Sequence, residues 1–402
     1  MITPAEAEQL LRENLRPWDS EECPLAEAQG RVLRAELRGD RDWPPFDRVT
    51  RDGYALRAAA LAAGTREFRI EARQAAGMRP FQLGAAPDAC IEVAAGAVLP
   101  AGADGVIPRE ETTTEGNRMQ VLAAVTALTP GQAVRRRGSD FRQGAVLVPA
   151  GTRVTGREIA VAASVGAAAL VVARQPKIAV VATGDELVEV GDAVAPHQIR
   201  RSNDHALRAA LLLAGYPRVE RFHLHDMRHE IEHMLWHIIA EFDVVLITGG
   251  VSKGKFDFLP AELDAQGVRK VFQGVAQQPG PSVWFGVNPA GKPVFALPGN
   301  PVAAYLCFHR YVLPALAHAS GLPPPAPQTA VLTAPVTFPP KRAYLLPVKL
   351  TSGADGKRGA TPDPGGPSGD FSGLAGTDGF VELPAQPTEF PAGYVARFWP
   401  WS

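Results

Sequence analysis

Three short segments of the sequence combine glycine or proline with polar side chains, each directly after a stretch that predicts a buried strand. They are Thr183-Gly184-Asp185-Glu186, Thr248-Gly249-Gly250-Val251-Ser252 and Pro298-Gly299-Asn300-Pro301. Glycine lets backbone N–H groups approach an anion closely, and a following helix adds its positive N-terminus. Parallel strands would bring the three segments to one sheet edge, where ligands bind. The pattern predicts a site for a phosphorylated, nucleotide-like ligand, although each segment alone could simply end a strand.

Carboxylate side chains accompany these segments. Glu186 follows the first strand, Asp226 comes at the end of another strand, and Asp257 follows the second segment. Several carboxylates beside bound phosphate favour Mg²⁺, a hard cation that prefers oxygen ligands. We therefore expect Glu186, Asp226 and Asp257 to hold this metal. The alternative for each is a helix cap or a solvated surface group, and Asp52 could be only a turn former.

The segment 229–233 reads His-Glu-Ile-Glu-His and matches the zinc-protease signature. Helical projection argues against such a site, because it places the three histidines of this helix, His229, His233 and His237, opposite the apolar face. That face consists of Ile231, Leu235, Ile238 and Phe242. A catalytic zinc ion also needs a cleft and a third protein ligand. We interpret the histidines as a solvated stripe.

The architecture is clearest between residues 176 and 321. Residues 178–182 are apolar without alternation, as expected for a strand buried on both faces. The pattern predicts further strands over 218–224, 243–248 and 293–297, and helices over 203–214, 227–242 and 302–316. Strands that alternate with helices indicate βαβ units and a parallel sheet. The fold class is therefore multidomain α/β.

The remaining sequence predicts three more domains. Residues 1–40 and 143–175 form an elongated linking domain, with a helix capped by Thr3 at its start and an Ala-rich helical stretch up to residue 173. Residues 41–142 are rich in short strands and turns and predict a β-rich module. Residues 176–321 are the α/β domain, and 322–402 predict a small C-terminal β domain with a long loop over 351–378.

Composition excludes several protein classes. The 402 residues carry 41 Lys+Arg and 42 Asp+Glu, so the net charge of −1 gives no support to nucleic-acid binding by bulk charge. The basic run 135–137 fits either a phosphate site or an ordinary solvated turn. No apolar stretch reaches the ~20 residues that span a bilayer. The three cysteines, Cys23, Cys90 and Cys307, are widely spaced, which suits a reducing compartment, so we expect a soluble cytoplasmic protein.

Taken in order, these motifs resemble those of the molybdopterin molybdenumtransferases, the family that includes the C-terminal domain of gephyrin. The matching segments run through most of the chain: residues 45–55, 96–104, 183–187, 202–203, 248–257 and 297–301. The resemblance implies a homodimer of four-domain subunits whose α/β domain is similar to molybdopterin adenylyltransferases. The resemblance also implies a contact with the adenylyltransferase that supplies the substrate. We expect no nucleic-acid or membrane partner.

The implied reaction takes adenylylated molybdopterin and molybdate, inserts molybdenum at the dithiolene and releases AMP with the help of Mg²⁺. By motif, the catalytic acids would be Asp52, Glu186, Asp226 and Asp257. The resemblance gives Thr183, Gly184, Asp185, Thr248, Gly249, Gly250, Ser252, Pro298, Gly299, Asn300 and Pro301 as the residues that bind the molybdopterin substrate. Asp52 belongs to the β-rich module, which suggests a site shared between domains or across the dimer.

The sequence departs from the family pattern at several positions. Arg51, Ala95 and Ser139 replace a Met, a Thr and a Glu of the family motifs, while Asp140 matches. Gly274, Gln278 and Pro281 stand where the family has three lysines that should stabilise phosphates and molybdate. Each lost charge-assisted contact costs ~1.5–3 kcal/mol in favourable geometry. Candidates to compensate are Arg200, Arg201, Lys253 and Lys255.

Two functions therefore compete. The retained carboxylates favour a working molybdenumtransferase, and the missing lysines favour a paralogue that binds a molybdopterin-type ligand without turnover.

Overall fold

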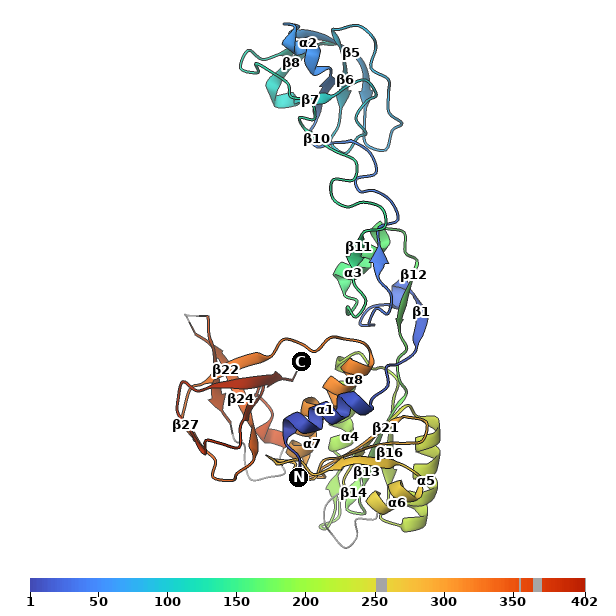
Figure 1. The fold of residues 1–402 in the computed structure, drawn as a ribbon, viewed down its shortest axis with the longest axis vertical. Helices are drawn as coiled ribbons and strands as arrows, with labels where there is room; N and C mark the ends of the chain where they lie inside the picture. The colour runs from blue at the N-terminus through green and yellow to red at the C-terminus, as the bar shows by residue number, and fades with distance from the viewer. Residues whose placement is uncertain (251–258, 354–355, 364–370, 402) are drawn as a thin grey trace. The chain divides into compact units, whose positions relative to one another are not determined.

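The computed structural model describes residues 1–250, 259–353, 356–363 and 371–401 (Figure 1). The chain forms two compact units. Unit 1 comprises Met1–Ala35, Ala150–Thr155 and Ala169–Ser402, and unit 2 comprises Glu36–Pro149 and Gly156–Ala168. No helix in the described part of the chain has the length and hydrophobicity needed to cross a membrane.

The central sheet of unit 1 is parallel where the sequence predicts it. The strands β16 (Val219–Leu224), β13 (Ile178–Thr183), β17 (Val244–Thr248) and β21 (Pro293–Leu297) lie side by side in this order, all parallel. In chain order, β13 is followed by β16, which pairs with one side of β13, and then by β17, which pairs with its other side. The strand order therefore reverses between β13 and β17. Such a switch point opens a crevice at the carboxyl ends of the strands.

Two antiparallel strands extend this sheet, which makes it mixed. They are β20 (Trp284–Val287), beside β21, and β18 (Arg269–Gln273) at the edge. A short turn joins β20 to β21, and in it the amide of Lys292 donates to Oδ1 of Asn288 at 2.9 Å. A connection this short can only return the chain antiparallel, whereas a parallel strand needs a long crossover.

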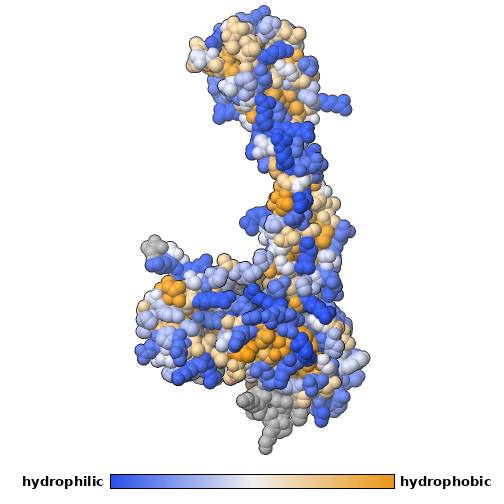
Figure 2. Space-filling model, viewed as in Figure 1, coloured by the Kyte–Doolittle hydropathy of each residue, from blue (hydrophilic) through white to orange (hydrophobic). Residues whose placement is uncertain are grey.

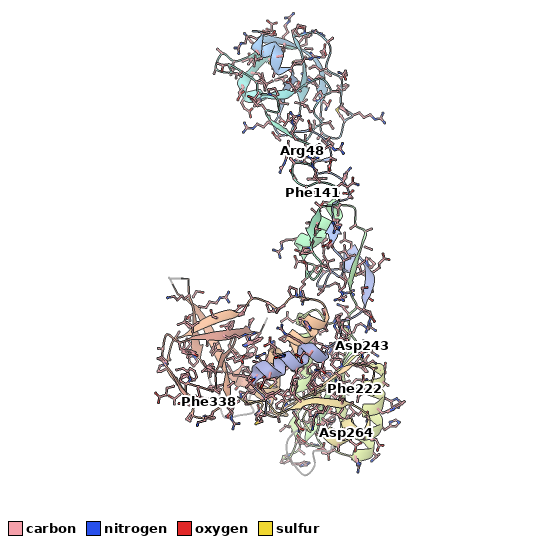
Figure 3. All side chains as sticks on the ribbon, viewed as in Figure 1. Arg48, Phe141, Phe222, Asp243, Asp264 and Phe338 are labelled. Atoms are coloured by element: carbon pink, nitrogen blue, oxygen red, sulfur yellow. The ribbon has the colours of Figure 1, made fainter. Side chains whose placement is uncertain are left out.

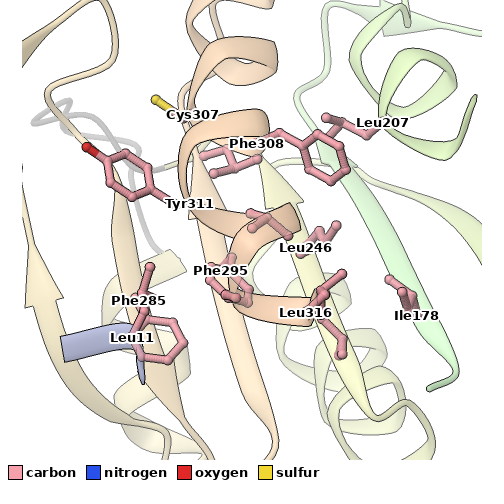
Figure 4. Close-up of a cluster of buried hydrophobic side chains, with 14 of the residues drawn as sticks. Leu11, Ile178, Leu207, Leu246, Phe285, Phe295, Cys307, Phe308, Tyr311 and Leu316 are labelled. Atoms are coloured by element: carbon pink, nitrogen blue, oxygen red, sulfur yellow. The ribbon is translucent and has the colours of Figure 1, made fainter. Parts of the chain in front are cut away.

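Helices cover both faces of the sheet. Alternate residues of β13 enter different clusters: Ile178 and Val180 pack with α1, α4 and α8, whereas Ala179 and Val181 pack with α5 and α6. The helices are α1 (Pro4–Asn14), α4 (Asn203–Leu213), α5 (Arg228–Glu241), α6 (Leu259–Ala265), α7 (Pro301–Cys307) and α8 (Leu313–Ala319). Figure 4 shows side chains of the first cluster between the strands and the covering helices. The strand is therefore buried on both sides, as its unbroken apolar run predicts.

The helix predicted over 302–316 is not one regular helix. A π-helical segment, η3 (Phe308–Val312), separates α7 from α8. Pro314 lies at the start of α8 and has no N–H to donate to the preceding turn, which explains why regular α-helical bonding is interrupted here. The N-terminal capping box of α1 forms as predicted, with Thr3 and Glu6 satisfying each other's backbone N–H groups.

The Ala-rich stretch that was expected to stay helical to residue 173 does not. Helix α3 covers Gly156–Ser164, and Gly166 then adopts a positive φ of 73°. The following β12 (Ala169–Ala173) pairs antiparallel with β1 (Ser20–Pro24). Val171 and Val172 are β-branched and favour a strand here, where β1 is available for pairing.

The C-terminal part of unit 1 is a β domain, in agreement with the prediction. Its sheet has the order β19-β24-β25-β22-β28-β26. The strands are β19 (Gln277–Gln278), β22 (Gln328–Leu332), β24 (Ala343–Ser352), β25 (Arg358–Pro362), β26 (Gly379–Leu383) and β28 (Val395–Pro400), with β23 (Val336–Thr337) pairing β27 (Glu389–Phe390) nearby. Figure 3 labels Phe338, which stacks on Tyr344 of β24 at a ring distance of 4.2 Å.

Unit 2 contains a separate β-rich sheet with the order β7-β4-β6-β5-β9-β8. These strands are β4 (Gly53–Leu56), β5 (Glu67–Gln74), β6 (Ala89–Val93), β7 (Gly105–Pro108), β8 (Thr112–Glu115) and β9 (Arg118–Val121). Gly53 lies so close to β7 that an added Cβ would come 2.9 Å from the carbonyl carbon of Ile107. The close approach of β7 therefore explains why a glycine follows Asp52, independently of any role of Asp52 in catalysis.

The surface seen in Figure 2 is largely hydrophilic, with smaller hydrophobic areas between the polar side chains.

Candidate functional site

A pocket of about 510 Å³ lies at the carboxyl ends of β13 and β17, at the switch point of the sheet. It is lined by Ala182, Thr183, Gly184, Glu186, Leu187, Ile199, Arg200, Arg201, Ser202, Asn203, Asp204, Asp226, Thr248, Gly249, Gly250, Ser282, Gly299, Asn300 and Pro301. The three segments singled out in the sequence thus meet in one cavity. The parallel register explains this, because Ala182 pairs with Thr248 and Thr248 with Leu297.

Close packing between the three loops depends on glycine. An added Cβ at Gly249, whose φ is 93°, would lie 2.7 Å from Oγ1 of Thr183. An added Cβ at Gly299 would lie 3.6 Å from the Cα of Gly249. Thr183 is buried, and its hydroxyl donates to the carbonyl of Thr248 at 3.4 Å. Backbone groups, rather than side chains, therefore form this part of the wall, which suits anion binding.

Glu186 and Asp226 both line the pocket, and both are exposed to solvent. They come from loops that follow neighbouring strands, β13 and β16. Asp185 is not among the lining residues. Its Oδ1 instead accepts from the amide of Asp226 at 3.0 Å and lies 3.3 Å from Nδ1 of His225. Asp185 therefore ties the two loops together and positions Asp226, rather than facing the cavity.

The third loop has a structural role as well as a place in the wall. Oδ1 of Asn300 accepts from the amide of Ala303 at 2.9 Å and caps α7. Nδ2 of Asn203 donates to the carbonyl of Gly299 at 2.9 Å, which fixes the loop against the start of α4. Pro298 precedes the lining residues Gly299 to Pro301 and is not one of them.

Arg201 lies in the pocket wall between two carboxylates. Its Nη2 forms an ion pair with Glu189 and lies 3.7 Å from Oδ2 of Asp204. Asp204 is fully buried, and its Oδ2 also accepts from Nη1 of Arg221 at 3.0 Å. The pKa of Glu189 falls to about 2, because its carboxylate accepts from the Val190 amide and from His205 and pairs with Arg201. This network holds Arg201 in a defined position.

Asp204 and Ser282 were not among the residues predicted for the site. Asp204 directly follows the matching segment 202–203, and that proximity was the one available signal. Ser282 directly follows Pro281, one of the three positions where the family has a lysine, and that proximity was its only signal in the sequence.

Among the described residues that line the pocket, acidic side chains outnumber basic ones. Glu186, Asp204 and Asp226 oppose Arg200 and Arg201, which leaves a net charge of −1 when all five are ionised. None of the three positions that lack the family lysines, 274, 278 and 281, is among these lining residues. Of the four candidate compensating cations, Arg200 and Arg201 do line the pocket, whereas Lys253 and Lys255 lie outside the described residues.

Three other predicted site residues are not placed in the pocket. Ser252 and Asp257 lie outside the described residues. Asp52 belongs to unit 2, where its Oδ1 accepts from the amide of Ala95 at 2.7 Å. That bond gives Asp52 a local structural partner, and its catalytic assignment rests on the motif.

The basic run 135–137 is engaged by acids of unit 2. Arg135, Arg136 and Arg137 pair with Asp140, Asp47 and Asp42, at 2.7, 2.7 and 3.0 Å respectively. The turn interpretation accounts for these arginines without a phosphate. The histidines of α5 are exposed, and Ile231, Leu235, Ile238 and Phe242 are buried, as the helical projection predicts.

Comparison with known proteins gives matches along the whole chain. Residues 2–166 match the model of the MoeA N-terminal region (domain I and II), 179–318 that of the "Probable molybdopterin binding domain", and 329–401 that of the MoeA C-terminal region (domain IV). A molybdopterin molybdenumtransferase of Synechocystis sp. is 36% identical over 404 residues, covering 100% of both chains. The chain belongs to the molybdopterin molybdenumtransferase family.

Further relatives agree with this assignment. A molybdopterin molybdenumtransferase of Bacillus subtilis is 30% identical and covers 96% of this chain and 93% of its own. The crystal structure of the molybdopterin biosynthesis moeA protein from Pyrococcus horikosii superposes with a TM-score of 0.83 at 29% identity, covering 100% of this chain and 99% of that one.

Membership in the molybdopterin molybdenumtransferase family confirms the predicted recognition and multidomain α/β fold class. It also makes the chain an enzyme of molybdenum cofactor biosynthesis. All lining residues of the pocket, from Ala182 to Pro301, fall within the matched region 179–318.

Proposed function

We propose that this pocket binds adenylylated molybdopterin together with molybdate, inserts molybdenum at the dithiolene and releases AMP. The observation that carries the proposal is the meeting of three glycine-containing loops and two exposed carboxylates in one cavity of about 510 Å³. Water added across the phosphoanhydride leaves AMP and molybdopterin phosphate. The family membership supports molybdopterin and molybdate as the substrates.

Phosphate groups of the substrate would meet backbone donors first. Gly184, Gly249 and Gly299 contribute loops without side chains at the wall, and α4 starts there with its positive end. Among the described contacts, the side chain of Ser202 makes no capping hydrogen bond to α4. Backbone N–H groups at this end are thus available to a phosphate or molybdate oxygen.

The excess of negative charge in the pocket has to be compensated when an anion enters. Arg200 and Arg201 supply two cations, and we assign to them part of the work of the missing lysines. Arg201 is the better placed, since Glu189 and Asp204 hold its guanidinium at the wall. Arg200 is exposed, and its Nε donates to the carbonyl of Val190 at 3.0 Å.

Mg²⁺ would supply further positive charge for the bound anion. Within the described residues, no group of three or more acidic, histidine or cysteine side chains could hold a metal ion. Mg²⁺ does not need one, because it is commonly bound by one or two carboxylates plus substrate phosphates and water. Glu186 and Asp226 would supply these carboxylates, joined by Asp257 on the motif. Bound Mg²⁺ would neutralise phosphate charge as the phosphoanhydride breaks.

Glu186 and Asp226 would also orient the attacking water, because an exposed carboxylate can accept its proton. Asp185 keeps Asp226 in place because its Oδ1 accepts a hydrogen bond from the backbone amide of Asp226. We further propose that the protein works as a homodimer, and that it receives its substrate from a molybdopterin adenylyltransferase. Light scattering at micromolar concentration tests the dimer, and a monomer would refute it.

Complementation gives the decisive test of function. We expect the gene to restore molybdoenzyme activity in cells that lack their own molybdenumtransferase, and the purified protein to release AMP from adenylylated molybdopterin only with molybdate. Arg201→Gln should weaken binding of the substrate more than the matched Arg208→Gln, because Arg208 lies on α4 outside the pocket lining. A wild type that binds the ligand without turnover would establish the scaffold paralogue instead.

A further inference from the structure

The exposed face of α5 carries a histidine pair that the pocket does not use. His229, His233 and His237 follow one another at intervals of four residues, and all three are exposed. Residues four apart lie on the same face of a helix, one turn above each other. This face therefore presents imidazoles to solvent, whereas the opposite face packs against the sheet.

Within the described structure, two of these histidines converge. Nε2 of His233 lies 3.3 Å from Nε2 of His237, with the ring centroids 4.6 Å apart and the rings inclined at 72°. No contact of this kind joins His229 to His233 among the described interactions. The pair brought together is thus His233–His237, not the pair of the zinc-protease signature.

We propose that His233 and His237 form a two-histidine site for a borderline divalent transition-metal ion. Zinc-to-imidazole bonds of ~2.0–2.1 Å at a tetrahedral angle place two nitrogens ~3.3–3.4 Å apart. The observed separation of 3.3 Å meets this distance requirement. At this distance the two nitrogens can share a proton or a metal ion, and metal binding displaces that proton.

The chemistry of the pair sets its selectivity. Imidazole nitrogen suits Cu²⁺, Ni²⁺ and Zn²⁺, with Cu²⁺ bound most tightly, whereas Mg²⁺ prefers oxygen. No third protein ligand joins the pair among the described residues, so water completes the coordination shell. The site is therefore open, distinct from the pocket, and able to bind its ion whether or not the pocket holds Mg²⁺.

Trp236 provides a reporter for this site. Its ring lies 4.9 Å from that of His237, edge to face, and the residue is 59% exposed. Titration of the full-length, untagged protein with Cu²⁺ in excess Mg²⁺ should quench part of the tryptophan emission with a 1:1 stoichiometry. The variant Trp236→Phe should lose this quenching while calorimetry still detects the bound Cu²⁺.

Three single variants separate the alternatives. His237→Ala and His233→Ala should each weaken Cu²⁺ binding by at least tenfold, and the matched control His229→Ala should change it less than twofold. Equal losses in His229→Ala and His237→Ala would overturn the proposal, as would a wild type without saturable binding below 100 µM Cu²⁺ (~5.5 kcal/mol). Loss in His229→Ala and His233→Ala with His237→Ala unaffected would assign the metal to the signature pair instead.

Discussion

The carboxylate of Glu186 lies directly against the backbone of Gly184. A Cβ added to Gly184 would come 2.8 Å from the carboxylate carbon of Glu186, and the φ of Gly184 is 139°. His223 reinforces the turn through a 2.9 Å hydrogen bond between its Nε2 and the carbonyl of Gly184. The absence of a side chain at position 184 thus leaves room for the carboxylate of a proposed catalytic acid.

Gly184→Ala should therefore impair turnover by displacing Glu186. The new methyl group occupies the place of the carboxylate, and alanine is strained at this φ. We expect AMP release to fall at least about tenfold. Gly191→Ala is the matched control, since a Cβ there meets no atom within 4 Å. Equal activity of the two variants, measured by AMP release with molybdate, would show that turnover does not depend on the position of Glu186 against Gly184.

Removing a proposed catalytic acid should damage turnover more than binding. For Asp226→Asn and for Asp257→Ala we expect normal folding, retained binding of adenylylated molybdopterin and AMP release cut at least about tenfold, or about 1.4 kcal/mol in barrier. Reduced repulsion could even tighten binding of the anionic ligand. Asp264→Asn on α6, labelled in Figure 3, is the control. Wild-type rates in Asp257→Ala would remove that residue from the mechanism.

Arg310 should be a major contributor to the stability of unit 1. Its side chain is 1% exposed, and it pairs with Glu8 of α1 at 3.0 Å and with Glu382 of β26 at 2.8 Å. Arg310→Met removes the buried cation that both carboxylates share, which costs about 3–5 kcal/mol. Arg12→Met removes only an exposed pair with Glu8 and should cost less than about 1 kcal/mol. Urea titration compares the two, and similar midpoints would contradict the prediction.

Asp243, labelled in Figure 3, should make stability depend on pH in the acid range. Burial tends to raise the pKa of Asp243, but hydrogen bonds from Arg174 at 2.9 and 3.0 Å and from the Lys177 amide at 2.8 Å outweigh it, so the pKa is lowered. Its stabilisation is therefore present above the unfolded-state pKa of about 3.9 and lost as pH falls through the folded-state pKa.

The matched measurement uses Asp243→Asn. The difference in unfolding free energy between wild type and this variant should shrink as the pH is lowered from 5 to 3. A difference that stays constant over this range would show that the carboxylate charge contributes nothing.

The histidines of α5 should be dispensable for turnover. His229→Ala combined with His233→Ala removes only exposed side chains, so AMP release should stay within about twofold of wild type. A loss of AMP release in the folded variant would contradict this expectation and give the histidines of α5 a role in turnover.

Local sequence pattern was enough to predict the buried strand, the faces of one helix and the family. Residues 178–182 have the unbroken apolar run of a strand buried on both faces, and β13 is such a strand. The helical period of α5 separated the buried Ile231 and Leu235 from the exposed histidines. The ordered motifs led to the family, because the glycines and carboxylates that follow the strands can be recognised in the sequence without knowing the tertiary structure.

Which of these residues share a cavity could be seen only from the three-dimensional structure. Asp185 and Glu186 are neighbours in sequence, yet Glu186 lines the pocket while Asp185 holds the amide of Asp226. Asp204 and Ser282 enter the wall through the positions of α4 and β20. Strand order and ion pairing between distant segments leave no periodic trace in the sequence. His229 and His237 are each four residues from His233, so the helical period could not show that His237 is the one that lies 3.3 Å from it.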